Sequence, residues 1–526
     1  MVGRILKIIT LITCFLDLST NSLWALDDQT KVKMTISSSV YVSGDLVSLQ
    51  LLSGGKLDEV MPEGNLINLY LVASDGQSVS MQRFNTAEWQ RGMAFELPKE
   101  LETGNYKLVA HVPGSAFQTE AIIHVYNPTI FSSAIIPRNA DPKVGIAKNL
   151  FQQSLLPVQI DTARKLIKLP PQLEDAGVLA VKIFDPTLEA LPVIGVVKNS
   201  EITVDDQPEF RLDPISKDAN SRISVFFLDL GVVKEFNMRD SAAIEAELIQ
   251  QRGTSAVWAY QFDNRGAQIG EVPIMLNEPK SLNFSAFDNT VPFSYEVVNM
   301  LDHKRKRKYI NQIYRIDSDG YESLYNDSTQ AVPDQIYLST NYEGIATLRE
   351  AFSSVISKAS VKRSKDGYEI LLASVNSGFK YETGPLILVN GIPMFETGDL
   401  IETPFHQIES VSIYNSINSQ KQFGVLGRHG VVSFKIKEEF LDKINLGQKA
   451  YPVYQGVSQL VLSENRISEK HPDLRSVLFW NPFLFLDENE NKTLSWNPSD
   501  IMGEYVLWID FVNKEGISKQ WIQPLQ

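Results

Sequence analysis

Short runs in which apolar and polar residues alternate dominate the first 128 residues of the chain. Three of them are VKMTI at 32–36, VSLQLL at 47–52 and YKLVA at 106–110, and turn-forming residues such as Ser43-Gly44-Asp45 lie between them. Alternation with a period of two places the apolar side chains on one face of a strand, and short strands with regular turns are typical of a β-sandwich. The pattern predicts a β-sandwich over residues 29–128.

Residues 129–290 contain further strand-like runs that prolines separate. The runs are Val178–Phe184, Ile223–Leu228, Ala256–Phe262 and Val272–Leu276, and Pro170-Pro171 is one of the breaks. Proline has no N–H for a strand ladder and therefore marks strand ends and turns. We expect one or two further β-sandwich domains over residues 129–290.

The period changes to that of a helix at residues 295–314. Apolar residues that recur at helical spacing can share one face, namely Val297, Val298, Leu301, Tyr309, Ile310 and Ile313. We predict a helical connector over residues 291–340 with these side chains on its buried face. The HKRKRK run at 303–308 is interpreted as its solvated face.

Residues 341–440 mix both periods. The segment 345–356 reads IATLREAFSSVI and predicts an amphipathic helix, whereas the apolar run LILV at 386–389 is typical of a strand buried on both faces. Asn390-Gly391 supplies the positive φ angles of a tight reversal. Three glycines, Gly424, Gly427 and Gly430, interrupt the chain before a last strand at 431–436. The mixture of helical and strand periods therefore predicts an α+β domain over residues 341–440.

Residues 451–526 return to strand-like patterning, with SVLFWNPFLFL at 476–486 and YVLWIDFV at 505–512. This predicts a C-terminal sandwich over 451–526. The fold class is therefore multidomain and mainly β, with sandwiches and one α+β domain.

The N-terminus has the layout of an export signal. Arg4 and Lys7 accompany an apolar core, and small residues lead to Ala25 before a polar stretch. We expect a signal peptide over residues 1–25 and a mature protein in the periplasm, peripherally associated with the outer membrane. The alternative is a lipoprotein attached through Cys14. No later run reaches the ~18 apolar residues of a membrane helix, so no transmembrane segment is expected.

Charge and cysteine content narrow the possible chemistry. The net charge of −14 argues against nucleic acid as a partner, because phosphate binding needs clustered Lys and Arg. The single cysteine, Cys14, lies in the expected signal, so disulfides, thiolate metal sites and cysteine nucleophiles are excluded from the mature chain.

Motifs for catalysis, cofactors and metals are absent from the sequence. No GxSxG, GxxxxGK[ST] or HExxH occurs, and none of the six histidines pairs at the spacing of two ligands on one strand or helix. The glycines of GVLGRHG at 424–430 lead into a strand, whereas a dinucleotide fingerprint opens a helix. We expect no catalytic, cofactor-binding or metal-binding residues and no enzyme activity.

The α+β segment resembles the plug domain of TonB-dependent outer-membrane receptors in its Bacteroidetes form. The family pattern is a "plyvvDGvp" strand, an "IEsievlKd" strand and "yGsrGanGVvlItTk". Here they read PLILVNGIP at 385–393, IESVSIYNS at 408–416 and FGVLGRHGVVSFKIK at 423–437, with Asn390 in place of the aspartate. A plug fills a 22-stranded barrel, and residues 438–526 leave no room for one, so a plug-like domain without its own barrel is implied.

Other segments resemble macroglobulin-type (MG2) domains of exported Bacteroidetes proteins. YVSGDLVSL at 41–49 and GNYKLVA at 104–110 match "YkPGdtV" and "G.Y.l.a", with Ser43 in place of the proline. DLRSVLFWNP at 473–482 with GEY at 503–505 resembles the sandwich that follows plug-like segments in these proteins. The resemblance implies binding functions, since the mature chain has no cysteine for the thioester of trapping inhibitors.

These observations lead to one expected function and two alternatives. The expectation is a non-enzymatic exported interaction protein that docks on, or plugs, an outer-membrane barrel or translocation channel from the periplasmic side. The alternatives are a periplasmic or surface scaffold for nutrient uptake or envelope maintenance and, third, a glycan or peptide hydrolase. The residues expected to contact the partner are Asn390, Gly391, Tyr414, Phe423, Gly424, Gly427, Arg428, His429 and Gly430.

Overall fold

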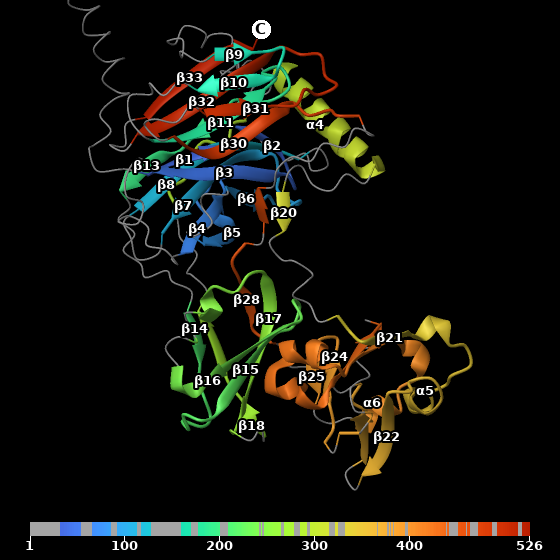
Figure 1. Cartoon of the computed structure of the whole chain (residues 1–526). Coiled ribbons are helices and arrows are strands. Elements are labelled where there is room, and N and C mark those ends of the chain that lie inside the picture. Colours follow the sequence, from blue (N-terminus) through green and yellow to red (C-terminus); the bar gives the residue numbers. More distant parts are fainter. Residues whose placement is uncertain are drawn as a thin grey trace, which may run out of the picture. The chain divides into compact units, whose positions relative to one another are not determined.

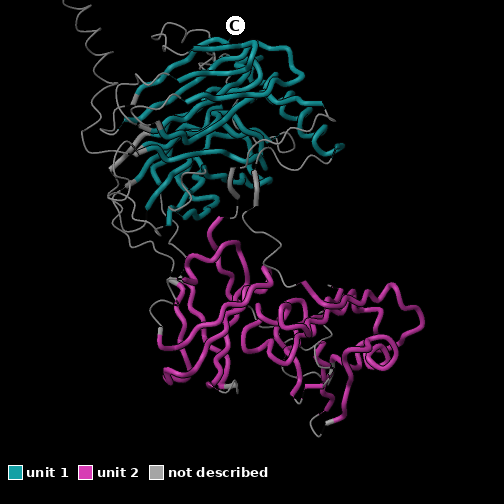
Figure 2. Tube along the Cα trace, viewed as in Figure 1, with its two compact units in different colours: residues 1–205, 281–322, 460–526 teal, residues 206–280, 323–459 magenta. Residues whose placement is uncertain are grey.

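The chain forms two compact units, which Figure 2 colours separately. Unit 1 combines Met1–Asp205, Ser281–Glu322 and Leu460–Gln526, and unit 2 combines Asp206–Lys280 and Ser323–Gln459. The computed structural model describes residues 32–53, 66–85, 92–112, 117–127, 159–169, 177–199, 209–240, 244, 247–264, 268–277, 284–291, 295–314, 321–323, 332–364, 367–375, 378, 380–381, 383–394, 398–437, 439–440, 451–458, 460–462, 472–486, 492–513 and 518–525. The expected signal peptide and Cys14 lie outside these residues.

Two antiparallel sheets form the first sandwich of unit 1 (Figure 1). One has the order β12-β1-β3-β6-β29-β20, and its strands are β12 (Val193–Ile194), β1 (Val32–Ile36), β3 (Leu46–Ser53), β6 (Met93–Glu96), β29 (Leu460–Leu462) and β20 (Tyr321–Ser323). The other has the order β13-β8-β7-β4-β5, with β13 (Val196–Asn199), β8 (Phe117–Tyr126), β7 (Gly104–His111), β4 (Leu66–Val72) and β5 (Ser78–Asn85), and β2 (Val40–Val42) runs parallel to β8.

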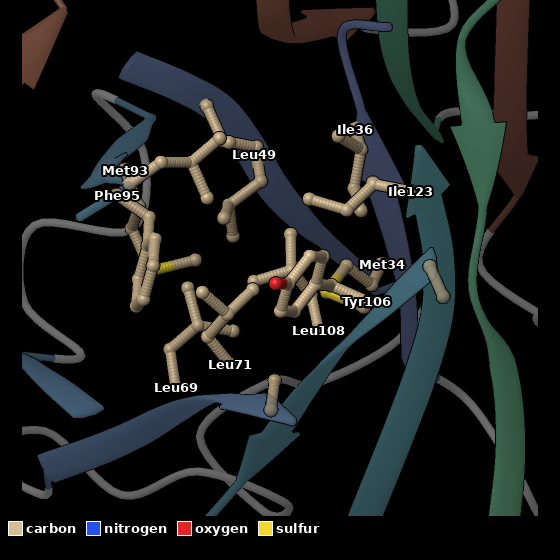
Figure 3. Packing of buried hydrophobic residues seen from close by; sticks show 14 of the residues in the cluster. Met34, Ile36, Leu49, Leu69, Leu71, Met93, Phe95, Tyr106, Leu108 and Ile123 are labelled. Carbon is tan, nitrogen blue, oxygen red and sulfur yellow. The ribbon is translucent and has the colours of Figure 1, made fainter. Parts of the chain in front are cut away.

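The core of this sandwich lies between the two sheets. Figure 3 shows Met34 and Leu49 of the first sheet facing Leu71 and Leu108 of the second. Met34 and Leu49 alternate with polar residues along β1 and β3, so the period of two places them on the inner face. Leu71 and Leu108 lie on β4 and β7, whose residues are buried throughout.

A second pair of sheets completes unit 1 around its own core. The larger has the order β30-β11-β32-β33, with β30 (Val477–Leu486), β11 (Gly177–Phe184), β32 (Tyr505–Asn513) and β33 (Ser518–Leu525). The smaller consists of β31 (Lys492–Ser495), β10 (Leu166–Leu169) and β9 (Gln159–Asp161). Strand β11 is therefore paired on both sides by strands from the end of the chain. The sheet joins segments that the sequence analysis assigned to separate domains.

Helix α4 (Tyr295–Tyr314) lies within the stretch expected to be helical, but its buried face differs from the prediction. Among its residues only Val297 and Met300 are buried, while Val298, Tyr309 and Ile313 are exposed. The expected buried face is confirmed for Val297 and for Leu301, which packs against the same cluster, and is wrong for Val298, Tyr309 and Ile313. Polar contacts add to this apolar packing. Lys304 Nζ donates to Val40 O over 3.0 Å.

Residues 209–277 form the first domain of unit 2. The order β16-β15-β17-β18 describes its main sheet, with β16 (Val232–Asn237), β15 (Arg222–Phe227), β17 (Thr254–Phe262) and β18 (Gln268–Glu271). Strand β28 (Val453–Gln455) pairs with β17, β14 (Glu209–Leu212) pairs with β19 (Ile274–Asn277), and the 3-10 turn η3 spans Met238–Asp240. Phe210, Phe227 and Tyr454 belong to its core.

The α+β domain forms the second part of unit 2. Its sheet has the order β21-β26-β27-β24-β25, with β21 (Gln335–Leu338), β26 (Ile408–Tyr414), β27 (Val431–Ile436), β24 (Leu386–Val389) and β25 (Ile392–Met394). The other elements are α5 (Leu348–Ser354), the hairpin β22 (Ala359–Ser364) with β23 (Gly367–Leu372), α6 (Gly398–Ile401), α7 (Ile417–Gln420), η5 (Ser339–Asn341), η6 (Phe405–Gln407) and η7 (Lys421–His429).

Helices α5 and α6 and the β22–β23 hairpin share one core with this sheet. Leu348 and Phe352 of α5 are buried there, as the amphipathic pattern predicted. The reversal at Asn390-Gly391 is confirmed, since both residues have positive φ, at 48° and 85°. The expected burial of the LILV strand on both faces is also confirmed, because all four residues of β24 are buried.

Candidate functional site

The α+β sheet has a second face that is only partly covered by apolar residues. Ile387, Val389, Val411, Ile413, Val432 and Phe434 belong to the core on the first face. Their neighbours in sequence point the other way, and the strand register aligns them in rows. One row is Ile336, Ser412, Ser433 and Leu388, and the next is Leu338, Ser410 and Lys435. The second face is therefore a shelf of small polar side chains with apolar ends.

The 209–277 domain packs on one end of this shelf. Phe226, Leu228 and Trp258 of that domain form a cluster with Leu386, Leu388, Phe423 and Val431 of the α+β domain. The ring centroids of Tyr414 and Phe423 lie 5.1 Å apart, edge to face. At the hairpin turn, a Cβ on Gly391 would approach Leu228 O to 2.9 Å, so glycine permits this close contact.

A carboxylate of the 209–277 domain holds the glycine-rich turn. Glu235 Oε2 accepts a hydrogen bond from Val425 N over 2.6 Å, and its Oε1 accepts one from Arg222 Nη1 over 2.8 Å. Gly424 has φ 57° and ψ −143°, a conformation that is essentially restricted to glycine. An added Cβ at this position would also collide with the Glu235 carboxylate. Backbone conformation and contact both require glycine here.

The other two glycines of the turn serve the internal packing of the α+β domain. A Cβ on Gly427 would lie 2.6 Å from Gln420 O, and Gly430 has φ 88° directly before β27. The physical reason for glycine expected from the sequence, tight turns before a strand, is confirmed.

A cavity of about 530 Å³ lies between the two domains, beside the packed cluster. Phe226, Asp229, Val232 and Val233 line it from the β15–β16 hairpin. Ser410, Ser412, Ser433 and Lys435 line it from the shelf, and Leu388, Asn390, Gly391, Tyr414 and Phe423 complete its wall.

The structure places the nine expected contact residues in three different settings. Four of them, Asn390, Gly391, Tyr414 and Phe423, line the cavity. Gly424, Gly427 and Gly430 shape the turn.

The remaining two lie at the end of the turn. Arg428 is exposed, and its Nε donates to His429 Nε2 over 2.8 Å. His429 also lies edge to face with Tyr381, at a centroid distance of 5.7 Å. Burial, and then the charge of Arg428, lower the pKa of His429, which favours the neutral ring.

Sequence reasoning missed the serines of the shelf and the contributions of the 209–277 domain. A signal for the serines was available, because IESVSIY at 408–414 alternates apolar and polar residues. For Phe226, Val233 and Glu235 no local signal exists, since their role depends on packing against residues more than 150 positions away.

The charged groups that line the cavity already have partners. Asp229 Oδ2 accepts a hydrogen bond from Ala256 N over 2.6 Å. Lys435 Nζ lies 3.1 Å from Glu409 Oε1 in an exposed ion pair. Within the described parts of the chain, no group of three or more His, Cys, Asp or Glu residues could hold a metal ion.

Unit 1 contains a separate buried cluster of charges. Lys182 is fully buried on β11, donates to Ala190 O over 3.2 Å and also to Ser37 O, and lies 3.8 Å from Glu189 Oε1. Burial lowers the pKa of Lys182 to about 8, against the opposing effect of Glu189. Since both carbonyls and the carboxylate surround the ammonium group, this cluster is a packed structural site.

Comparison with family models and with curated proteins gives no match, whereas comparison with solved structures does. No protein-family model matches the chain. No curated protein matches it either. Among the helices that the structure describes, none has the length and apolar character needed to cross a membrane.

Solved structures similar to the chain include bacterial alpha-2-macroglobulins. One is Escherichia coli alpha-2-macroglobulin activated by porcine elastase, with 9% identity, a TM-score of 0.22 and coverage of 94% of this chain and 43% of that chain. Another is Salmonella alpha-2-macroglobulin reacted with methylamine, with 9% identity, a TM-score of 0.23 and coverage of 94% and 39%. This chain thus spans less than half of the length of these proteins. In the residues that the structure describes, this chain itself is mainly β and forms several sheets.

Proposed function

We propose that this chain is a non-enzymatic, exported interaction protein that binds an outer-membrane barrel or translocation channel from the periplasmic side. The observation that carries the proposal is the α+β domain of residues 332–440. It has a closed core of its own, and it carries the glycine-rich turn on which the resemblance to plug domains rests. Such a module offers a compact, preformed surface for a partner.

The exposed side of the turn is the most direct contact surface for that partner. Arg428 projects from the turn, while Phe423 and Gly427 anchor it from beneath. A specific interface of this kind buries roughly 800 Å² per partner, so neighbouring exposed residues such as Ile417 would take part.

Site-specific photocrosslinking in native envelopes tests the proposal. A photoreactive residue at Arg428 is expected to crosslink to a barrel protein. The same residue at Ser353, which is exposed on α5, serves as the matched control and is expected to give weaker or different products. Recovery of no barrel protein from Arg428, in samples where crosslinking to other chains is efficient, would contradict the proposal.

One observation favours the second candidate, a periplasmic scaffold. Glu235 and Leu228 of the same chain already occupy part of the turn and of the Gly391 hairpin. A scaffold would use this contact to fix its own domains. In that case deletion of the protein would change neither secretion nor channel leakage, and Arg428 crosslinks would identify soluble envelope proteins.

A further inference from the structure

The glycine-rich turn places an arginine and a histidine next to each other at its exposed end. Gly430 N donates to Gly427 O over 2.8 Å, and both glycines are buried, so the backbone on each side of Arg428 and His429 is fixed. Arg428 is exposed, whereas His429 is half-buried. The two side chains therefore meet at the surface that we propose as the partner contact.

The hydrogen bond between these side chains determines the protonation state of the ring. Arg428 Nε lies 2.8 Å from His429 Nε2, and a guanidinium group has donors but no acceptor. His429 Nε2 must therefore accept this hydrogen bond, which requires a neutral ring with its proton on Nδ1. A hydrogen bond from an ionised donor is stronger than one between neutral groups, so it favours this state.

The surroundings of the ring give no support to a positive charge. Tyr381 packs edge to face against His429 at a centroid distance of 5.7 Å, and the Tyr381 hydroxyl accepts a hydrogen bond from Gln420 Nε2 over 3.2 Å. His429 Nδ1 is buried and has no hydrogen-bond partner among the described residues. Within the same part of the chain, Arg428 is the charged group that acts on this ring. No carboxylate of the described residues therefore compensates a protonated His429.

Protonation of the ring removes the acceptor of this hydrogen bond. Nε2 then carries a proton and can only donate, so two cations face each other where an attraction existed before. Histidine has an ordinary pKa within the range of about pH 5 to 8, so a modest change in pH is sufficient. Burial and then Arg428 lower the pKa of His429, so the hydrogen bond is lost as pH falls through this lowered value.

We propose that the glycine-rich turn is a pH-dependent switch, in which neutral His429 orients Arg428 for the partner and protonated His429 releases it. The partner contact weakens as pH falls, because fewer chains then hold Arg428 in the orientation that binds. The inference rests on the proposed function only for the partner contact, since the contact between Arg428 and His429 lies within this chain.

Nitrogen-15 NMR of the six histidine rings in the full-length chain tests the switch without a partner. The ring signal that is lost in His429→Gln, or in His429→Asn if the first variant is unfolded, assigns His429. At about pH 8 we expect its proton on Nδ1. A proton on Nε2 overturns the inference.

A matched pair of variants tests the coupling between the two side chains. Arg428→Met is expected to raise the pKa of His429, since the opposing cation is removed. Lys421→Met removes an exposed cation from the start of the same 3-10 segment, η7, and is expected to leave the pKa of His429 unchanged. An unchanged pKa in Arg428→Met, or an equal rise in both variants, overturns the inference.

Crosslinking measures whether the switch controls the partner contact. A photoreactive residue at Ile417, which is 60% exposed on α7, leaves Arg428 and His429 in place. Its yield of barrel protein is expected to fall roughly threefold between about pH 7.5 and 5.5. The yield should stay constant in the His429→Gln background, because the glutamine oxygen accepts the hydrogen bond without titrating. A constant yield with His429 in place, or an equal fall in both backgrounds, overturns the inference.

The two proposals fail separately. If no barrel protein is recovered at either pH, while NMR shows the proton on Nδ1 and the effect of Arg428→Met, the proposed function falls and the switch stands. If a barrel protein is recovered but the ring is not coupled to Arg428, the reverse holds.

Discussion

At the scale of single residues, glycines and carboxylates fix the geometry of the candidate site. Gly424 combines positive φ with a close approach to Glu235, so two independent constraints act at one position. Gly344 has φ 89°, and nothing lies within 4 Å of a Cβ added there, so only its backbone conformation favours glycine. This difference allows the two effects to be separated.

Gly424→Ala is expected to lower the free energy of unfolding of unit 2 by about 2–4 kcal/mol, since backbone strain and a collision with Glu235 add. Gly344→Ala should cost about 1–2 kcal/mol, from backbone conformation alone. Urea unfolding followed by hydrogen exchange of the amides of unit 2 measures both. Equal costs for the two variants would show that Glu235 does not constrain the turn.

Asp334 is a second residue with a defined electrostatic role. Its Oδ2 accepts hydrogen bonds from Asn415 N, Ser416 N and Ser419 Oγ, at 2.6, 2.8 and 2.6 Å. Burial raises the pKa of Asp334, but these hydrogen bonds outweigh burial and hold the pKa below its ordinary value. The carboxylate joins the segment before β21 to the start of α7.

A depressed folded-state pKa stabilises the protein above the unfolded pKa of ~3.9, and this contribution disappears as pH falls through the folded value. The protection factors of the amides of residues 415–419, which compare the measured exchange rate with the intrinsic rate at each pH, should therefore fall below about pH 4. In Asp334→Asn these protection factors should already be lower at pH 7, by a factor that corresponds to about 1 kcal/mol, and should depend less on pH. An unchanged exchange rate in the variant would argue against this role.

At the scale of elements, α4 shows how polar contacts can anchor a helix with little apolar surface. Lys304 Nζ lies 3.8 Å from Glu189 Oε1 and 3.9 Å from Asp45 Oδ2, over the ring of Tyr41. Although burial raises the pKa of Glu189, Lys304 and then Lys182 outweigh it and lower the pKa. Removal of Lys304 leaves Lys182, at 3.8 Å, as the remaining cation beside Glu189, so the buried carboxylate is only partly compensated.

Lys304→Met should lower the free energy of unfolding of unit 1 by about 2–3 kcal/mol, because Glu189 loses one of its two cations. The amides of α4 should then exchange faster. Arg305→Met is the matched control, since Arg305 is exposed and its ion pair among the described residues, with Asp302, lies within the helix. Its expected cost is about 0.5 kcal/mol or less. Similar exchange of α4 in both variants would contradict this assignment.

At the scale of the whole molecule, unit 1 is assembled from three distant segments. Strand β11 pairs with β32 in continuous register and with β30 through two register shifts, and Lys33 of β1 contacts the buried Asp510 of β32 over 2.7 Å. The sheet that contains β11 therefore needs the end of the chain to be complete. Unit 2 is inserted within it in sequence.

Truncation after residue 459 should leave β11 without partners and expose its apolar face, so unit 1 is expected to be lost to limited proteolysis and to aggregate. Replacement of residues 345–440 by a Gly-Ser linker keeps every strand of unit 1 and is expected to leave a protease-resistant core. A truncated chain with an intact unit 1 would show that the pairing of β11 is dispensable.

The sequence by itself determined the local features of this protein, and the tertiary structure decided the contacts between distant segments. The Asn390-Gly391 reversal, the buried strand before it and the α5 helix follow from residue types and periodicity, because φ preferences and amphipathic patterns are local. The position of β11 between β30 and β32, the exposure of Tyr309 and Ile313 on α4 and the cover that Glu235 and Leu228 place on the glycine-rich turn do not. Backbone hydrogen bonds are nearly the same for every residue, so the sequence of a strand does not specify which strand pairs with it. The packing of side chains in the folded chain determines the pairing.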